Sequence, residues 1–326
     1  MLRRLKDIRV LPLLLLLLSG CTVAEPVVPL AAEFPQAAPT AAQAPVVATS
    51  TPLAETQTPQ EIVRVIYIED APGSPTDAPA STPTPDSRLT AKYWAEWPLI
   101  PEVSSRAKAI YQQGIASGND PRAFSTIGDC QSEPAVFMGT YDTETYLLGQ
   151  GYEHLTETIE QFRGSFDRDS VTVRDGLSVA SVLSPMWADP ERCIEKETPL
   201  ACEIRIHKPS IMFINLGTNW KGGNEVTHEE YLRKIVDELV AHGVVPVISS
   251  KGDNQEGDHR INQSMARVAY DYDVPFWNFW RSIRDLPGKG IDGTREGGYL
   301  TTEAWGRRSF TGLQALDAVW RELSGE

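Results

Sequence analysis

Two stretches of this sequence have the pattern of a buried strand that ends in polar residues able to do chemistry. The first is Ala123–Cys130, an apolar run that leads into Gly-Asp-Cys. A strand that ends in a small residue, an acid and a nucleophile can raise a reactive side chain above the edge of a sheet. The second is Ile211–Asn219, which ends in Gly-Thr-Asn. Because the carboxyl ends of parallel strands share the edge where ligands bind, the two stretches predict one common site.

The N-terminus has the features of an export signal. Residues 1–20 contain a basic segment and then the leucine-rich run Leu11–Leu18, which is too short for a transmembrane helix. The residues Leu-Ser-Gly-Cys that end at Cys21 resemble the lipobox of bacterial lipoproteins, which implies cleavage before Cys21 and lipidation of its sulfur. We therefore expect an extracytoplasmic protein whose partner is the membrane, through lipidated Cys21. The alternative is an ordinary signal peptide with an incidental cysteine.

Residues 21–88 are rich in Pro, Ala and Thr and are expected to form a disordered tether, because such a composition buries too little apolar surface to offset chain entropy. One interruption, Glu61–Ile68, alternates like a strand. It is either a transient strand in a disordered linker or a segment that docks on the sheet edge or on a partner.

The cysteines of the exported chain suggest one disulfide. Cys193 and Cys202 bracket a short polar loop, so that a bond between them is the default expectation. This leaves Cys130 unpaired, although its pairing with either of the other two remains an alternative. No Cys/His spacing suggests a metal site and no glycine-rich phosphate loop is present, so no cofactor is predicted.

Residues 89–326 are long enough for one domain, and strand and helix patterns alternate along them. This alternation predicts an α/β fold, a three-layer α/β/α sandwich with a parallel sheet. Besides the two strands above, the patterns predict strands at Ser170–Arg174, Val244–Ser249 and Val274–Phe279, and helices at Ser104–Ser117, Tyr152–Phe162, Thr227–His242, Asp258–Tyr272 and Ser309–Leu323. Thr227 and Glu230 are spaced as a capping box at the start of the third of these helices.

The formal net charge of -14, with acids spread along the domain, argues against nucleic acid as a partner, because nucleic-acid-binding proteins need a basic face. The acidity itself is expected to serve solubility.

The order of the motifs resembles the SGNH/GDSL hydrolases, over nearly all of residues 89–326. The resemblance implies a flavodoxin-like fold and an ancestry in ester hydrolysis on acylated carbohydrates or lipids. Cys130 takes the place of the family's serine nucleophile, Gly176 matches the glycine of the second block, and Asn219 matches the asparagine of the third. In the family these three positions form the oxyanion hole, whose fixed donors stabilise a tetrahedral intermediate.

The fourth block departs from the family's Asp-x-x-His. Glu296 and Tyr299 stand at the positions of the family's Asp and His, and the second alignment, Asp292–Arg295, also lacks a histidine. A phenol with a pKa of about 10 is a poor base at pH 7. The only candidate for an alternative base is His259, which could approach Cys130 through a loop that folds inward, although a solvated histidine at a helix start is the ordinary interpretation.

Three functions follow from the sequence as hypotheses. One is an SGNH-family surface lipoprotein with Cys130 at the nucleophile position and without efficient hydrolysis. In an active version of this hypothesis the protein is an esterase that uses His259 as its base. Another is a non-catalytic lipoprotein that binds an acylated glycan or cell-envelope ligand in the same cleft. The third is a structural lipoprotein in which Cys130 is inert or disulfide-linked.

Overall fold

The computed structural model describes residues 88–220 and 224–325. The expected signal segment 1–20, the lipid site Cys21, the tether up to residue 87 and the alternating stretch 61–68 lie outside the described residues. Among the helices that the structure describes, none is both long enough and apolar enough to cross a bilayer.

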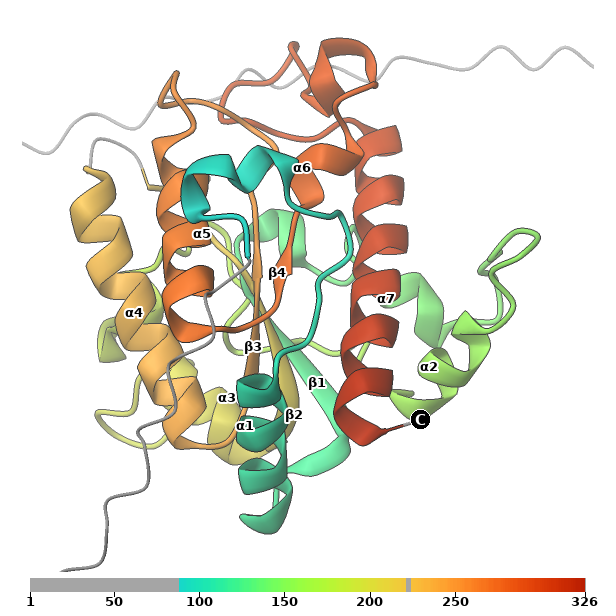
Figure 1. Cartoon of the computed structure of the whole chain (residues 1–326). Coiled ribbons are helices and arrows are strands. Elements are labelled where there is room, and N and C mark those ends of the chain that lie inside the picture. Colours follow the sequence, from blue (N-terminus) through green and yellow to red (C-terminus); the bar gives the residue numbers. More distant parts are fainter. Residues whose placement is uncertain (1–87, 221–223, 326) are drawn as a thin grey trace, which may run out of the picture. The chain divides into compact units, whose positions relative to one another are not determined.

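A parallel sheet organises the described chain, with four strands in the order β1-β2-β3-β4 (Figure 1). The strands are β1 (Asp120–Gly128), β2 (Pro209–Asn215), β3 (Val245–Ser249) and β4 (Phe276–Trp277). An isolated parallel bridge joins Gly128 to Val173 and extends the sheet beyond β1. Counted in chain order with this bridge, the strand order is 2-1-3-4-5, which is the flavodoxin-like order.

The expected strand at Ser170–Arg174 is therefore reduced to one bridge, and side chains hold the segment in place. Thr172 Oγ1 donates to the backbone oxygen of Thr126 at 2.7 Å, while the N–H of Val171 donates to the buried carboxylate of Glu203 at 3.1 Å. These side-chain bonds take the place of the backbone hydrogen bonds that a longer strand would form with β1, because buried backbone groups need hydrogen-bond partners.

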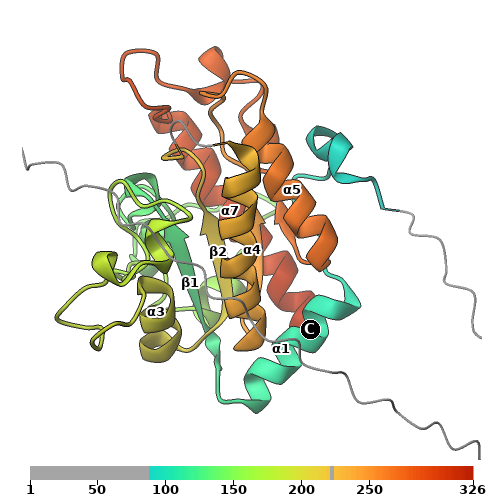
Figure 2. The ribbon, with the colours of Figure 1, turned by 90° about the vertical axis from the view of Figure 1, so that its left-hand side faces the viewer.

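Helices cover both faces of the sheet (Figures 1 and 2). The helices α1 (Ser105–Ala116) and α7 (Thr302–Ser324) pack together on one face, and α4 (Glu225–Ala241) and α5 (Arg260–Tyr272) pack together on the other. All seven residues of β2 are buried, as expected for a parallel strand covered on both sides. The predicted three-layer α/β/α architecture is confirmed.

Shorter elements complete the domain. They are α2 (Leu155–Gln161), α3 (Pro199–His207), α6 (Phe279–Ser282) and the 3₁₀ segments η1 (Ala91–Glu96), η2 (Cys130–Ser132), η3 (Gly139–Asp142), η4 (Ser181–Leu183), η5 (Pro185–Trp187) and η6 (Pro287–Gly290).

Several boundaries differ from the sequence-based expectations, and α2, for example, begins at Leu155 instead of Tyr152. Helix α4 begins at Glu225, because Asn224 and not Thr227 is the N-cap, and its side chain accepts the N–H of Thr227 at 2.8 Å. Helix α7 begins at Thr302 instead of Ser309, capped by Thr301. Strand β4 is only two residues long, because the chain turns into α6 directly after it.

Candidate functional site

The turn after β1 presents Cys130 at the carboxyl edge of the sheet. Asp129 shapes this turn, since its carboxylate accepts the N–H of Gln131 at 3.0 Å. Gly128 is required there by close packing, because a Cβ atom on it would lie 2.1 Å from Ser132 Oγ. Arg308 of α7 holds the turn in place by donating hydrogen bonds to the backbone oxygen of Gln131 and to Ser132 Oγ.

The structure brings Gly176 and Asn219 to the same turn. The Asn219 amide donates to Asp129 Oδ2 at 3.2 Å and to the backbone oxygen of Leu177, the neighbour of Gly176, at 3.4 Å. Gly176 has φ +75°, a conformation that favours glycine. Among the described residues, no hydrogen-bond acceptor is found for the backbone N–H of Cys130 or of Gly176. These two N–H groups thus have no protein acceptor in the described part of the chain, whereas the Asn219 amide is engaged by Asp129 and Leu177.

Tyr299 lies where the resemblance places the family's histidine. Its hydroxyl is 4.0 Å from Cys130 Sγ, and the Arg295 guanidinium lies over its ring, 3.6 Å from the centroid. The neighbouring Cys130 is the main cause that raises the pKa of Tyr299, so the phenol stays protonated at neutral pH. Glu296 is exposed on the same loop. Its side chain makes no hydrogen bond or ion pair that would orient Tyr299 in the described part of the chain.

The surroundings of Cys130 hold its thiol in the protonated form. Burial is the largest cause, followed by the carboxylates of Asp129 and Asp175, and together they raise the pKa of Cys130 to about 11, against a smaller lowering effect of the Tyr299 hydroxyl. A thiol ionises readily only near a cation, a helix N-terminus or a base. Here the carboxylates of Asp129 and Asp175 oppose the ionisation of the thiol.

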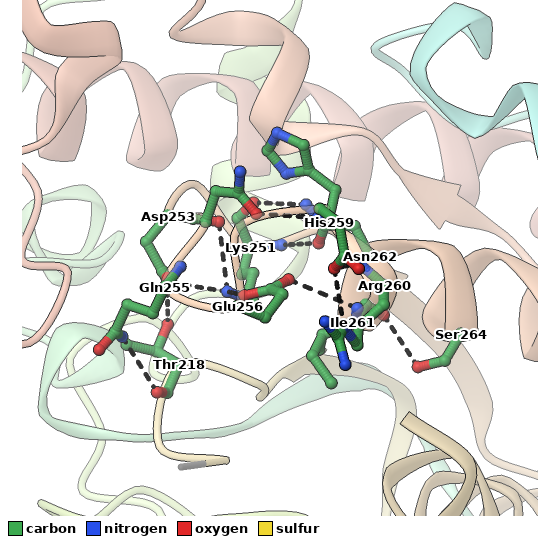
Figure 3. A network of polar contacts seen from close by, with 12 residues as sticks. Thr218, Lys251, Asp253, Gln255, Glu256, His259, Arg260, Ile261, Asn262 and Ser264 are labelled. Atoms are coloured by element: carbon green, nitrogen blue, oxygen red, sulfur yellow. Dashed lines mark hydrogen bonds and ion pairs between the residues drawn. The ribbon is translucent and has the colours of Figure 1, made fainter. Parts of the chain in front are cut away.

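His259 is not at this site. It precedes α5 with φ +56°, and its ring packs against Trp280 and Trp94 with centroid distances of 5.3 Å and 5.8 Å. Burial lowers its pKa. Its ring points away from the loop that follows β3 (Figure 3). The inward fold that would carry His259 to Cys130 does not occur, because a buried ion cluster holds that loop.

This ion cluster is centred on Lys251, whose side chain is 4% exposed. Its ammonium group bonds to Asp253 Oδ1 and to Glu256 Oε2, both at 2.6 Å, and to the backbone oxygen of Asp253 at 3.2 Å (Figure 3). Thr218, next to Asn219, donates to the other oxygen of Asp253 at 2.8 Å. The Gln255 amide bonds to the backbone oxygens of Thr218 and Gly297, each at 3.3 Å. The loops that carry Asn219 and Tyr299 are thereby tied to the loop after β3.

An open pocket lies over Cys130 with a volume of about 310 Å³. Besides Cys130, its lining includes Glu133, Asp175, Arg295, Tyr299 and Trp305. The indole N–H of Trp305 has no hydrogen-bond partner among the described residues. The pocket therefore offers aromatic faces, carboxylates and a guanidinium to a ligand, but no imidazole.

Sequence reasoning did not find Glu133, Trp305 or the effect of Asp175. Asp175 precedes Gly176 at the end of a predicted strand, so the rule that placed Gly176 at the edge could have found it as well. Trp305 lies in the first turns of α7, a region that the expected helix boundary at Ser309 left out. Trp220, which follows Asn219, packs against His228 and Tyr231 and does not line this pocket.

Cys193 and Cys202 form a disulfide, with Cα atoms 5.3 Å apart, and Cys130 is a free thiol. The only group of three potential metal ligands in residues 88–220 and 224–325 consists of these two cysteines and Glu197. Because the sulfurs are bonded to each other, they cannot both coordinate a metal as thiolates.

Neither a family model nor a curated protein matches this chain. Similar solved structures include a GDSL-like lipase from Bacteroides thetaiotaomicron with 14% identity and a TM-score of 0.40, which covers 65% of this chain and 97% of that one. The esterase EstA from Pseudoalteromonas sp. has 11% identity and a TM-score of 0.41 over 60% and 97% of the two chains. The acetylxylan esterase Axe2 from Geobacillus stearothermophilus has 12% identity and a TM-score of 0.39 over 61% and 94%.

By their names these proteins are a GDSL-like lipase and two esterases. Such low identities and scores say nothing about activity, and the architecture rests on the strand order of this chain itself. That order, with Cys130, Gly176, Asn219 and Tyr299 at one edge of a parallel sheet, is the arrangement expected of an SGNH/GDSL hydrolase-like fold.

Proposed function

We propose that this chain is a surface lipoprotein of the SGNH/GDSL type that binds an acylated glycan or a related cell-envelope polymer in the pocket over Cys130, without efficient ester hydrolysis. One observation carries the proposal. The group beside the Cys130 sulfur is the hydroxyl of Tyr299, 4.0 Å away, and not an imidazole, and the pKa of the thiol is raised to about 11.

The loss of hydrolysis follows from proton transfer. A thiol with a pKa of about 11 is thiolate in about one molecule in 10⁴ at pH 7, against a few per cent for an ordinary cysteine. Tyr299 cannot accept the thiol proton or activate water for the release of an acyl group. The N–H groups of Cys130 and Gly176 would still polarise a bound carbonyl. A bound ester would then be held in place and not turned over.

The lining of the pocket supports glycan binding. Tyr299 and Trp305 provide aromatic surfaces that can stack on a sugar ring, and Glu133, Asp175 and Arg295 provide hydrogen bonds that fix its orientation. The volume of about 310 Å³ is at the lower end of the usual range for ligand pockets, about 300–1,000 Å³. A short segment of a polymer would fit it. Export and lipidation at Cys21 would place the pocket outside the cytoplasm, on a tether formed by residues 21–88.

The test compares the full chain with Cys130→Ala in p-nitrophenyl acetate hydrolysis and in calorimetric binding to an O-acetylated polysaccharide. We expect equal, background hydrolysis for both proteins. We expect measurable binding that Trp305→Ala weakens at least tenfold and that Met186→Ala, a change at a 92% exposed side chain outside the pocket, leaves unchanged. Turnover that disappears in Cys130→Ala would contradict the absence of hydrolysis. Equal binding by the wild type and Trp305→Ala would contradict the ligand site.

A further inference from the structure

A second, smaller cavity lies where the three central strands end. Its lining includes Asp129 after β1, Asn215 and Thr218 at the end of β2, Lys251 and Asp253 after β3, and Arg308 of α7. Its volume is about 20 Å³. A cavity needs roughly 10–15 Å³ measured in this way to hold one water molecule, so this one has room for a single water.

The carboxamide of Asn215 points to an occupant. Asn215 is the last residue of β2, is 7% exposed and lies opposite Gly128 in the sheet. Neither its Nδ2 nor its Oδ1 has a hydrogen-bond partner among the described residues. Buried polar side chains are nearly always satisfied by protein or by ordered water.

The charges around the cavity decide what kind of occupant fits. Two carboxylates, Asp129 and Asp253, and two cations, Lys251 and Arg308, line the cavity, and a third carboxylate, Glu256, pairs with Lys251 from outside the lining. Lys251 already pairs with Asp253 at 2.6 Å. Arg308 is held by its bonds to the Cys130 turn, and burial lowers its pKa to about 10, which leaves it charged at pH 7. These charged groups already pair with one another, and a neutral molecule that both donates and accepts can satisfy the Asn215 amide without adding a charge to them.

We propose that one ordered water molecule occupies this cavity, hydrogen-bonded to the carboxamide of Asn215, and joins the segments that carry Cys130, Asn219 and Tyr299. Asp129, Thr218 and Gly298, the immediate neighbours of those three residues, all line the same cavity. Asn215 is in this view a positioning residue, which acts through the water and does not touch a ligand in the outer pocket. The inference does not depend on the proposed function.

Crystals of the full chain that diffract to about 1.8 Å or better test the site directly. We expect a density peak within hydrogen-bond distance, about 2.7–3.2 Å, of an amide atom of Asn215 and of at least one further polar atom of the lining. An empty cavity, a peak with the coordination distances of a metal ion, or an Asn215 amide bonded directly to protein would overturn the proposal.

A solution test uses the magnetic relaxation dispersion of water, which counts water molecules held for longer than the tumbling time. Asn215→Leu replaces the carboxamide by an apolar group of similar size and should lower the amplitude by the contribution of one water. Thr311→Val, a buried change in α7 away from the cavity, is the matched control and should leave it unchanged. An unchanged amplitude in folded Asn215→Leu would overturn the proposal. If that variant does not fold, the density of the wild-type crystal decides.

Discussion

A tyrosine hydroxyl beside a cysteine thiol makes a poor proton-transfer pair, because neither group accepts a proton readily at neutral pH. Cys130 and Tyr299 are such a pair, and Asp129 and Asp175 add negative charge that opposes ionisation of the thiol. The backbone N–H groups of Cys130 and Gly176 have no acceptor among the described residues, and an open pocket lies over Cys130. At the scale of single residues the site therefore departs from the one that the resemblance implies mainly at the positions of the nucleophile, Cys130, and of the base, Tyr299.

This reasoning predicts that two substitutions can create activity. Cys130→Ser combined with Tyr299→His supplies a hydroxyl and an imidazole in the positions that the resemblance assigns to nucleophile and base. We expect hydrolysis of p-nitrophenyl acetate to exceed that of Cys130→Ser alone by about 10²-fold or more, since a positioned general base contributes about 10²–10⁴.

The matched control is Cys130→Ser combined with Tyr299→Phe, which removes the hydroxyl without adding a base and should equal Cys130→Ser alone. If the histidine variant is folded and no faster than this control, the assignment of position 299 is wrong.

At the scale of the elements, the turn after β1 depends on Gly128, which allows Ser132 to pack closely against the backbone. Gly128→Ala would place its Cβ 2.1 Å from Ser132 Oγ and 2.4 Å from Ser132 Cβ, within a turn that Arg308 holds fixed. Overpacking of this kind typically costs about 1–3 kcal/mol. We expect a loss of that size in the free energy of unfolding measured with urea.

Gly306→Ala is the matched control for this change, because nothing lies within 4 Å of the added Cβ on the exposed side of α7. Alanine in a helix interior should stabilise the protein by up to about 1 kcal/mol. Equal effects of the two substitutions would show that the turn is not tightly packed.

The loop after β3 depends on the buried ammonium of Lys251. Lys251→Met leaves the buried carboxylate of Asp253 and the partly buried one of Glu256 without their counter-charge, and breaking a buried pair in this way costs about 3–5 kcal/mol. Lys108→Met, which removes an exposed pair with Glu322, should cost at most about 1 kcal/mol. Denaturant unfolding of both variants checks the difference, and a cost below 1 kcal/mol for Lys251→Met would contradict the role of the cluster.

The sequence predicts the elements whose hydrophobic pattern is regular and misses those that depend on tertiary contacts. The apolar runs of β1, β2 and β3 and the periodic faces of α4 and α5 are found in the structure close to their expected places. Helix α3 is not among the expected elements, because the polar stretch between Cys193 and Cys202 indicated a loop, whereas Pro199 occupies the first helical turn after the Thr198 cap. The strand at Ser170–Arg174 is shortened because Glu203, distant in sequence, takes over one of its backbone groups.

The candidate site likewise contains residues that the sequence could place and residues that only the tertiary structure places. Cys130, Gly176, Asn219 and Tyr299 could be placed from the sequence because each is tied to the end of a strand or to the segment before the last helix. The position of His259 and the roles of Arg308, Trp305 and Asp175 could not, because they depend on how distant segments pack. The raised pKa of Cys130 is a property of that packing and of no single motif.

At the scale of the whole molecule, the proposal places an α/β domain outside the cytoplasm on a lipid anchor. Cys21→Ser removes the sulfur to which the lipid would be attached. We expect the wild type to sediment with membranes and to need detergent for release, and the variant to appear in the soluble fraction of the same compartment. A wild-type protein that is soluble without detergent would contradict the anchor and would leave the domain and its pocket as described.

The apparent pKa of Cys130 tests the central claim most directly. The rate of alkylation by iodoacetamide, followed by mass spectrometry at Cys130 with Cys130→Ala as the blank, should rise about tenfold per pH unit from pH 7 upward and level off only near pH 11, because the folded protein holds the thiol protonated. Rapid alkylation at pH 7, with a plateau at or below pH 8.5, would mean that a base or a cation activates the sulfur, and the account of an inactive nucleophile would be contradicted.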